Sequence, residues 1–288
     1  MSTTQDTLLG QAMLLNLAIA EAANSAAKLI DNNGKYHVEQ KPNQEDKYDE
    51  VTDVYYSAQR HIVDVLIRFF PDCGIITEEE GLCCLSTHPL GLTFTIAPID
   101  VTKECVGGCN KFSIMIATFC SGQIIASMIL NPCTLESYQL SAVDSKVYRN
   151  RCGIVTELSF VMPARKRALL SFADRRDSRL SSLAMISEPD NGYFGSHLVI
   201  SGSYGTKVMI LASNVVSAIL TIPANIKPWD EAPSIGILAS LGYKYYVFDK
   251  STRTFDCQDL KFSPDTYYRE LTLITHPSIF NEFIHCFE

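Results

Sequence analysis

The sequence is short of charged residues, and of positive charge in particular, and both shortages exclude classes of protein. Charged residues make up 19% of the 288 residues and hydrophobic residues 47%, a balance that buries a large core and excludes an extensively disordered chain. Lysine and arginine number 24 against 32 aspartate and glutamate, so the formal net charge is −8 and the pI is near 5.3. This deficit argues against a nucleic-acid polymer or an anionic membrane as the main partner. A small anion can still bind where metal and lysine gather locally.

Paired cysteine motifs are also missing, although the chain has ten cysteines. Cys83 and Cys84 are adjacent and Cys105 and Cys109 are four apart, so neither pair has the spacing of a zinc knuckle or finger. A chain of this length does not depend on disulfides for its stability. We therefore expect reduced, mostly buried thiols in a cytosolic protein. A redox or metal cluster of cysteines is the weaker alternative.

Long apolar runs and a basic leader are absent from the sequence as well. No run approaches the length of a membrane span, and residues 1–30 lack the basic region of a signal peptide. In that segment Leu8, Ala12, Leu15 and Ile19 recur at helical spacing, which predicts an amphipathic first helix. We expect a cytoplasmic protein with no membrane partner.

Helical and strand patterns alternate along the chain and predict an α/β fold of layered helices and sheets. Two mixed halves, residues 1–162 and 163–288, are expected to pack as one compact unit. In the first half we predict helices over 1–30 and 51–70 and strands over 74–77, 92–96, 112–119, 124–130, 137–142 and 147–148. In the second we predict strands over 168–172, 198–200, 215–221, 243–248 and 271–274 and helices over 175–186, 206–214, 228–241 and 277–286. The polar stretch before residue 50 is either a long loop or an irregular hairpin.

Three carboxylates lie where a predicted strand ends or a predicted helix begins. Glu78 follows one strand, Asp100 ends the next, and Asp230 opens a helix after Trp229. Carboxylate oxygens are the ligands that Mg²⁺ prefers, and strand ends and helix starts can meet at one edge of a sheet. Each residue also has an ordinary alternative role: a surface charge for Glu78, a turn residue for Asp100 and a helix cap for Asp230.

The order of the segments around these carboxylates is more specific than any one of them. Residues 76–79 (Ile-Thr-Glu-Glu), 96–104 (Ile-Ala-Pro-Ile-Asp-Val-Thr-Lys-Glu) and 229–232 (Trp-Asp-Glu-Ala) resemble three signatures of the inositol monophosphatase superfamily. Those signatures read Gly-Glu-Glu, Asp-Pro-Ile-Asp-Gly-Thr and Trp-Asp-x-Ala-Ala-Gly. Val51-Thr52 is similar to the start of a fourth, Val-Thr-x-x-Asp. The resemblance extends from about Leu8 to Leu273.

The resemblance implies an αβαβα sandwich and a magnesium-dependent, lithium-sensitive phosphomonoesterase that forms a homodimer. By matching position, Glu78, Asp100, Asp230 and the carbonyl of Ile99 would be metal ligands. Glu78 and Thr102 would be the catalytic residues, with the Thr102 hydroxyl positioning the attacking water.

The same resemblance assigns the phosphate site and the branch of the superfamily. The backbone N–H groups of Val101 and Thr102, at a helix start, would hold the phosphate, and Lys207 would also bind substrate. Lys207 and the Thr102-Lys103-Glu104 run are closer to 3′(2′),5′-bisphosphate nucleotidases than to inositol monophosphatases.

The departures from the signatures fall on working positions. Ala97 stands where the family has a metal-bridging aspartate, Tyr55 where it has an acid that helps to activate water, and Val101 where it has a glycine that allows close approach of phosphate. One missing electrostatic contact at a transition state costs roughly 10²–10³ in rate. Two interpretations remain open. The chain is a hydrolase of small phosphate monoesters, either nucleotide bisphosphate or inositol phosphate, with impaired activity, or it is an inactive pseudoenzyme that binds a ligand or another protein.

Overall fold

The computed structural model describes twelve stretches of the chain, which together contain its two main sheets and most of its helices. These stretches are 2–32, 38–40, 50–78, 85–100, 111–162, 168–171, 197–199, 203–221, 227–249, 251–252, 254–258 and 272–284. A short antiparallel pair, β1 (Val38–Gln40) and β2 (Glu50–Thr52), borders the polar stretch before residue 50 and supports the hairpin alternative there.

The first sheet is built from consecutive strands of the N-terminal half. Its seven strands follow one another in space as they do in the sequence, and only β3 and β4 run parallel. The strands are β3 (Gly74–Thr77), β4 (Thr93–Asp100), β5 (Ser113–Cys120), β6 (Gln123–Asn131), β7 (Glu136–Leu140), β8 (Val147–Arg151) and β9 (Ile154–Leu158). A two-residue turn joins β5 to β6, and its residues Ser121 and Gly122 both have positive φ, at 49° and 79°. Such a turn matches the twist of an antiparallel hairpin. The strands predicted over 112–119 and 124–130 are confirmed on either side of it.

The second sheet has six strands, all from the C-terminal half, in the order β11-β10-β12-β15-β13-β14. Strand β10 (Ala168–Ser171) pairs parallel with β11 (His197–Val199) and with β12 (Ala218–Thr221). The remaining pairs, β12 with β15 (Thr272–Thr275), β15 with β13 (Lys244–Asp249) and β13 with β14 (Thr254–Gln258), are antiparallel. The sheet is therefore mixed, like the first.

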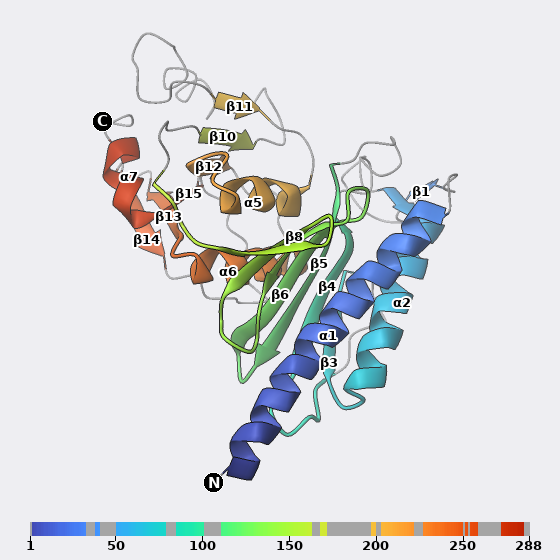
Figure 1. Cartoon of the computed structure of the whole chain (residues 1–288). Coiled ribbons are helices and arrows are strands. Elements are labelled where there is room, and N and C mark those ends of the chain that lie inside the picture. The colour runs from blue at the N-terminus through green and yellow to red at the C-terminus, as the bar shows by residue number, and fades with distance from the viewer. Residues whose placement is uncertain are drawn as a thin grey trace.

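The helices form the layers that separate and cover the two sheets (Figure 1). They are α1 (Ser2–Asn32), α2 (Asp53–Phe69), α5 (Tyr204–Ala212), α6 (Pro228–Ser240) and α7 (Pro277–Ile284). Helices α1 and α2 cover the face of the first sheet that carries Phe94 and Ile96. Helices α5 and α6 cover the opposite face, at Met115 and Ile129, and α5 also contacts β12 of the second sheet. The outer face of the second sheet meets α7, where Phe280 stacks on Tyr246. The predicted αβαβα order is confirmed.

Helix α1 corrects one expectation from the sequence. Its segment Leu8–Ile30 is long and apolar enough to span a membrane, so the expectation that no segment reaches that length is wrong. It is the only helix among the described residues that is long and apolar enough to do so, and 44% of its apolar segment is buried. Its inner face, including Leu15, Ile19 and Ile30, is part of the core between α2 and the first sheet. That packing is typical of the core helix of a globular protein.

Other predicted elements differ in detail. Strands β9 and β14 were not predicted, and the predicted helix over 175–186 lies outside the described residues. Helix α5 begins two residues earlier than predicted, because the Ser203 hydroxyl caps it and accepts the N–H of Thr206 at 2.9 Å. Strand β12 begins three residues later than predicted, since the chain first turns at Asn214, whose φ is 58°.

The cysteines are less buried than expected. Among the described residues, Cys73 is buried and Cys120 is partly buried, whereas Cys133, Cys152 and Cys257 are exposed. The expectation of mostly buried thiols is wrong for this part of the chain. The homodimer, the cytoplasmic location and the division at residue 162 stay predictions.

The contact between α6 and the first sheet leads to a stability prediction. A Cβ added at Gly236 would lie 2.2 Å from Ser127 Oγ and 2.9 Å from Ile124 Cγ2, whereas one added at Gly10, on the exposed side of α1, meets nothing within 4 Å. We expect Gly236→Ala to lower the free energy of unfolding by about 1–3 kcal/mol because the site is overpacked. As the matched control, Gly10→Ala should raise it by up to about 1 kcal/mol, since alanine is the better helix former.

Urea unfolding measures both changes. Ser127→Ala should recover part of the loss, because Ser127 Oγ has no hydrogen-bond partner among the described residues. A loss of equal size in both alanine variants would contradict the described packing of α6.

Candidate metal and phosphate site

The site begins with an irregularity in β4. Ala97 pairs with Met115 of β5 and Asp100 pairs with Ser113, so three residues of β4 span the distance of two residues of β5. This extra residue is a β-bulge, which shifts the alternation of side chains along the strand. As a result Ala97 and Asp100, which would otherwise alternate, both lie opposite residues on the face that α5 covers. The bulge thus aims the Asp100 carboxylate at α5.

The beginning of α5 receives that carboxylate. Gly205 N–H donates a hydrogen bond of 2.9 Å to Asp100 Oδ2, in a buried position. Glycine is required there, because a Cβ would lie 2.3 Å from Ser113 Oγ and 2.9 Å from Met115 Sδ. Ser113 Oγ is itself 2.9 Å from the hydroxyl of Ser203, the residue that caps α5. A helix N-terminus offers N–H groups and a positive dipole end, and both favour a negative charge.

The second carboxylate, Asp230, lies in the first turn of α6. Lys227 N–H donates to Asp230 Oδ2 at 3.3 Å, so the side chain helps to close the N-terminus of its own helix. Asp230 therefore helps to cap its own helix, which is the ordinary role that the sequence offered for it. Pro228, at the first position of α6, suits a helix start because its missing N–H would have no partner in the helix.

The third carboxylate, Glu78, comes directly after β3 and meets α2. Its Oε2 accepts a short hydrogen bond from the hydroxyl of Tyr55. Tyr55 is 1% exposed, so this phenol and the carboxylate meet inside the structure. Tyr55, which departs from the family signature, therefore contacts Glu78, one of the proposed metal ligands.

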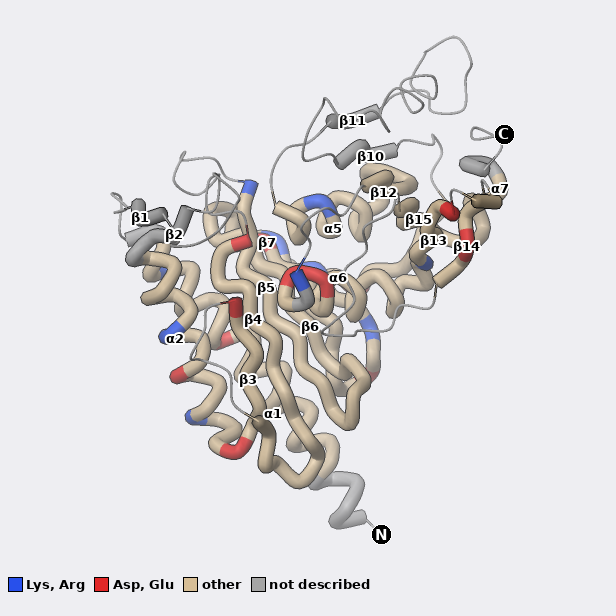
Figure 2. Tube along the Cα trace, turned by 180° about the vertical axis from the view of Figure 1, so that it is seen from behind, with Lys and Arg blue, Asp and Glu red and all other residues tan. Residues whose placement is uncertain are grey.

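The three carboxylates share one electrostatic environment. Burial raises the pKa of Asp100 from 3.8 to about 6; the charge of Glu78 also raises it, while Gly205 N–H, Lys207 and Ser203 lower it. Burial raises the pKa of Asp230 well above its usual range, and the charges of Asp100 and Glu78 raise it further. Figure 2 shows acidic positions near β4 and α6 on the same side of the molecule, with a basic position on α5. Like charges held together in this way favour protons or a cation.

Glu78, Asp100 and Asp230 supply carboxylate oxygens, which are the type of ligand atom that magnesium prefers. Within the part of the chain that the structure describes, however, no group of three or more histidine, cysteine, aspartate or glutamate side chains is arranged to hold a metal ion. Each carboxylate instead accepts a hydrogen bond from its own neighbour, namely Tyr55, Gly205 or Lys227.

The remaining predicted residues are placed as follows. Ala97 is fully buried and packs in the core on the α5 side of the sheet. Ile99 is 1% exposed and packs on the α2 side. Lys207, on α5, stabilises the charge of Asp100. Val101 and Thr102 lie outside the described residues, so their proposed roles, like the metal-ligand roles above, stay predictions.

Sequence reasoning missed two residues of this site. Ser203 and Gly205 hold Asp100 across more than a hundred positions of sequence, and a Ser-x-Gly at a helix start is too common to reveal such a contact. Glu231, the residue after Asp230, is 5% exposed, and burial raises its pKa to about 8.

Comparison with known proteins identifies the family of this chain. The sequence profile described as "Inositol monophosphatase family" matches residues 7–277. The chain belongs to the inositol monophosphatase family. Helices and strands from both halves fall inside the match, including every element that carries a carboxylate of the site.

Curated relatives in the family have two kinds of name. The Nus factor SuhB of Haemophilus influenzae is 22% identical over 284 residues, which cover 94% of this chain and 99% of that protein. That of Pseudomonas aeruginosa is 30% identical over 128 residues, 44% of this chain, and here the chain spans about half of the relative, 47%. The 3′(2′),5′-bisphosphate nucleotidase CysQ of Escherichia coli is 23% identical over 193 residues, 67% of this chain and 74% of that protein.

Solved structures of the family share the fold. SuhB from Bartonella henselae superposes with a TM-score of 0.72 at 16% identity, covering 96% of this chain and 98% of that one. An IMPase from Thermotoga maritima gives 0.69 at 21% identity, covering 93% and 94%. An IMPase/NADP phosphatase complexed with Mg²⁺ and phosphate gives 0.65 at 19% identity, covering 99% and 96%. At these identities the likeness establishes the fold.

The raised pKa of Asp100 leads to a prediction about stability without metal. An acid whose pKa is raised by folding keeps its proton in the folded chain and loses it in the unfolded one. The contribution of Asp100 to the free energy of unfolding is therefore largest below pH 3.8, and it is lost as the pH rises through about 6. Asp100→Asn cannot ionise but can still accept the Gly205 N–H. In EDTA at pH 7.5 we expect this variant to be more stable than the parent chain by up to about 3 kcal/mol.

Urea unfolding at pH 4 and pH 7.5 measures the effect, which should be small at pH 4. The exposed Asp72, at the end of α2, provides the control: Asp72→Asn should leave the difference between the two pH values unchanged. A metal-free Asp100→Asn variant that is less stable than the parent chain at pH 7.5 would contradict the assignment.

Proposed function

We propose that this protein binds small phosphate monoesters with magnesium at the edge formed by β3, β4, α5 and α6, and hydrolyses them at a reduced rate. The observation that carries the proposal is the electrostatic coupling of Glu78, Asp100 and Asp230, three acids that come from separate elements. Burying such a group has a high cost in free energy unless a cation or protons compensate it. Membership of the inositol monophosphatase family makes a phosphatase-like role the one to expect.

The residues of this chain would divide the work as follows. Glu78, Asp100 and Asp230 would hold magnesium, which when bound neutralises phosphate charge and activates water. The N-terminal turn of α5, at Gly205, keeps the Asp100 carboxylate oriented. Lys207 adds positive charge beside it. The relatives include a bisphosphate nucleotidase, and the matching family is that of inositol monophosphatases, which supports a nucleotide bisphosphate or an inositol phosphate as substrate.

Two features support a reduced rate. Ala97 has no ligand oxygen and is fully buried, so nothing at this position bridges two ions. The Tyr55 hydroxyl donates to Glu78, so a bound ion would have to displace this hydrogen bond or share the carboxylate with it. A charge-assisted hydrogen bond of this kind contributes about 1.5–3 kcal/mol.

The same two features favour a second candidate, an inactive protein that keeps the fold as a ligand-binding or protein-interaction subunit. In that case the carboxylates would be held by Tyr55, Gly205 and Lys227 and would not bind an ion. The names of the relatives fit both candidates, since some are called Nus factors and another a nucleotidase.

Phosphate release separates the two candidates. Adenosine 3′,5′-bisphosphate and inositol 1-phosphate are incubated with the protein in Mg²⁺, in EDTA and in Mg²⁺ with lithium. We expect slow release that EDTA abolishes and that rises at least about 10²-fold in the triple variant Ala97→Asp, Val101→Gly, Tyr55→Asp, because each change restores an electrostatic or steric element of the site.

Ala117→Asp is the matched control, because Ala117 is a fully buried alanine on the neighbouring strand β5. It should add no activity. The absence of Mg²⁺-dependent release from both the parent chain and the triple variant, with both folded, would reject the hydrolase and leave the inactive subunit.

The Tyr55 hydrogen bond can be tested by itself. Tyr55→Phe keeps the buried ring and removes the hydroxyl that donates to Glu78, so Mg²⁺ should bind about tenfold to 10²-fold more tightly. Tyr56→Phe is the matched control, because Tyr56 is the next residue on α2 and is 43% exposed. Calorimetric titration with Mg²⁺ measures the affinities. Equal affinity in the parent chain and in Tyr55→Phe would show that this hydrogen bond does not compete with the ion.

A further inference from the structure

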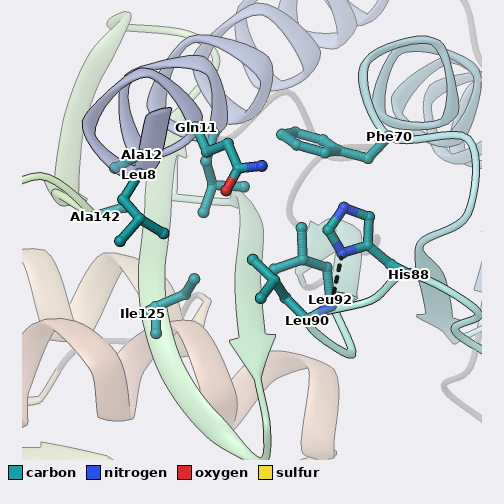
Figure 3. A pocket seen from close by; sticks show the side chains of 10 residues that line it. Leu8, Gln11, Ala12, Phe70, His88, Leu90, Leu92, Ile125 and Ala142 are labelled. Atoms are coloured by element: carbon teal, nitrogen blue, oxygen red, sulfur yellow. Dashed lines mark hydrogen bonds between the residues drawn. The ribbon is translucent and has the colours of Figure 1, made fainter. Parts of the chain in front are cut away.

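A cavity of about 190 Å³ opens between α1 and the loop that leads into β4 (Figure 3). Its walls come from the beginning of α1, the end of α2, residues 88–92 and the beginning of β6. The buried side chains Leu15, Phe70 and Leu92 form part of the lining, and the half-exposed Leu8 lies at the rim. The cavity is a hollow in the hydrophobic core that reaches the surface.

The proposed phosphatase site lies at the other end of the same strand. Leu92 directly precedes β4, and Asp100 is its last residue. Eight residues of extended chain span about 25 Å. The cavity therefore belongs to a different part of the molecule, and the function proposed above does not use it.

Two polar side chains stand out in the apolar lining, His88 and Gln11. His88 Nδ1 accepts the N–H of Leu90 at 3.2 Å, so the neutral ring carries its proton on Nε2 and can donate a hydrogen bond from there. Figure 3 shows the Gln11 amide reaching from α1 into the space between α1 and Phe70. Among the described residues neither His88 Nε2 nor the Gln11 amide has a hydrogen-bond partner. The apolar cavity is thus bordered by one donor, on the partly exposed His88, and one amide, on the exposed Gln11. Apolar walls with a few polar groups are the pattern of a small-molecule site.

The size and the rings of the lining define the ligand further. A cavity of about 150 Å³ lined by leucine, isoleucine and phenylalanine holds one benzene molecule. The present cavity accommodates one such ring and a small substituent. The rings of Phe70 and His88 stand edge to face, 6.2 Å apart and 75° inclined, and they offer a third aromatic ring the edge and face contacts that aromatic groups prefer.

We propose that this cavity binds a small phenol, a single aromatic ring with one hydroxyl group. The ring packs between Phe70 and the leucines of α1 and of the loop before β4. The hydroxyl accepts a hydrogen bond from His88 Nε2 and donates one to the amide oxygen of Gln11. Binding at this place does not depend on magnesium or on phosphate.

Direct binding to the full chain tests the proposal, with phenol, benzene and cyclohexanol as probes followed by ligand-observed NMR. Phenol should bind about threefold to tenfold more tightly than benzene, because it adds a hydrogen bond in an apolar site. It should also bind more tightly than cyclohexanol, which lacks the aromatic ring, and with the same affinity in Mg²⁺ and in EDTA. Failure of phenol to bind at millimolar concentration, or equal binding of phenol and benzene, would overturn the proposal.

Variants locate the binding. Ala142→Leu fills the cavity and should weaken phenol binding at least about tenfold, while Val143→Leu, at the next and exposed position outside the lining, should leave it unchanged. His88→Phe keeps a ring beside Phe70 but removes the donor, so it should reduce the affinity for phenol to that for benzene without weakening benzene. Thermal unfolding checks that each variant is folded. Unchanged phenol affinity in a folded Ala142→Leu or His88→Phe variant would place the binding elsewhere and reject the site.

Discussion

The hydrogen bond from Gly205 N–H to the Asp100 carboxylate joins the two halves of this protein at the place where the chemistry is proposed. It needs a bulge in β4, which turns Asp100 toward α5, and a glycine in α5, which lets the helix approach Ser113 and Met115. It also needs the serine that caps the helix. A carboxylate buried without such donors would be strongly destabilising, so the local features of β4 and α5 depend on one another.

The charged forms of the site's acids are destabilised by burial and by one another, and hydrogen bonds partly offset this. Burial and mutual repulsion raise the pKa values of Asp100 and Asp230, and each carboxylate accepts a hydrogen bond from a neighbouring group. The family signature would add another acid at position 97, where this chain has a fully buried alanine. With one acid fewer, the metal-free site carries less repulsion and the protein gains stability, but a bound ion has fewer ligands. Tyr55 acts in the same direction, because its hydroxyl supplies Glu78 with a donor that is part of the protein itself. We therefore expect the residues at positions 55 and 97 to stabilise the metal-free fold and to weaken the proposed metal site.

Strong periodic patterns predicted most of the elements. The strands over residues 74–77, 112–119 and 124–130 and the helix that begins at Pro228 were all confirmed. Strand β9 escaped notice because most of it is exposed, so it lacks the alternation that marks a half-buried strand. The apolar character of α1 was underestimated because Gln11, Asn16, Glu21 and Asn24 interrupt its apolar stretches, although the segment as a whole is apolar enough to span a membrane. The exposed cysteines show that composition does not reveal which residues pack inside.

The sequence by itself determined the family, the order of the layers and the three acids, because these depend on local patterns and on short signatures in a set order. It also showed where the signatures are broken, at Tyr55, Ala97 and Val101. Only the tertiary structure decided what the broken positions do, since Tyr55 meets Glu78 across 23 positions and Gly205 meets Asp100 across 105. The cavity between α1 and the loop before β4 likewise exists only after folding. Contacts of this kind depend on how a bulge and a helix start are placed against each other in space, and no local pattern in the chain encodes that placement.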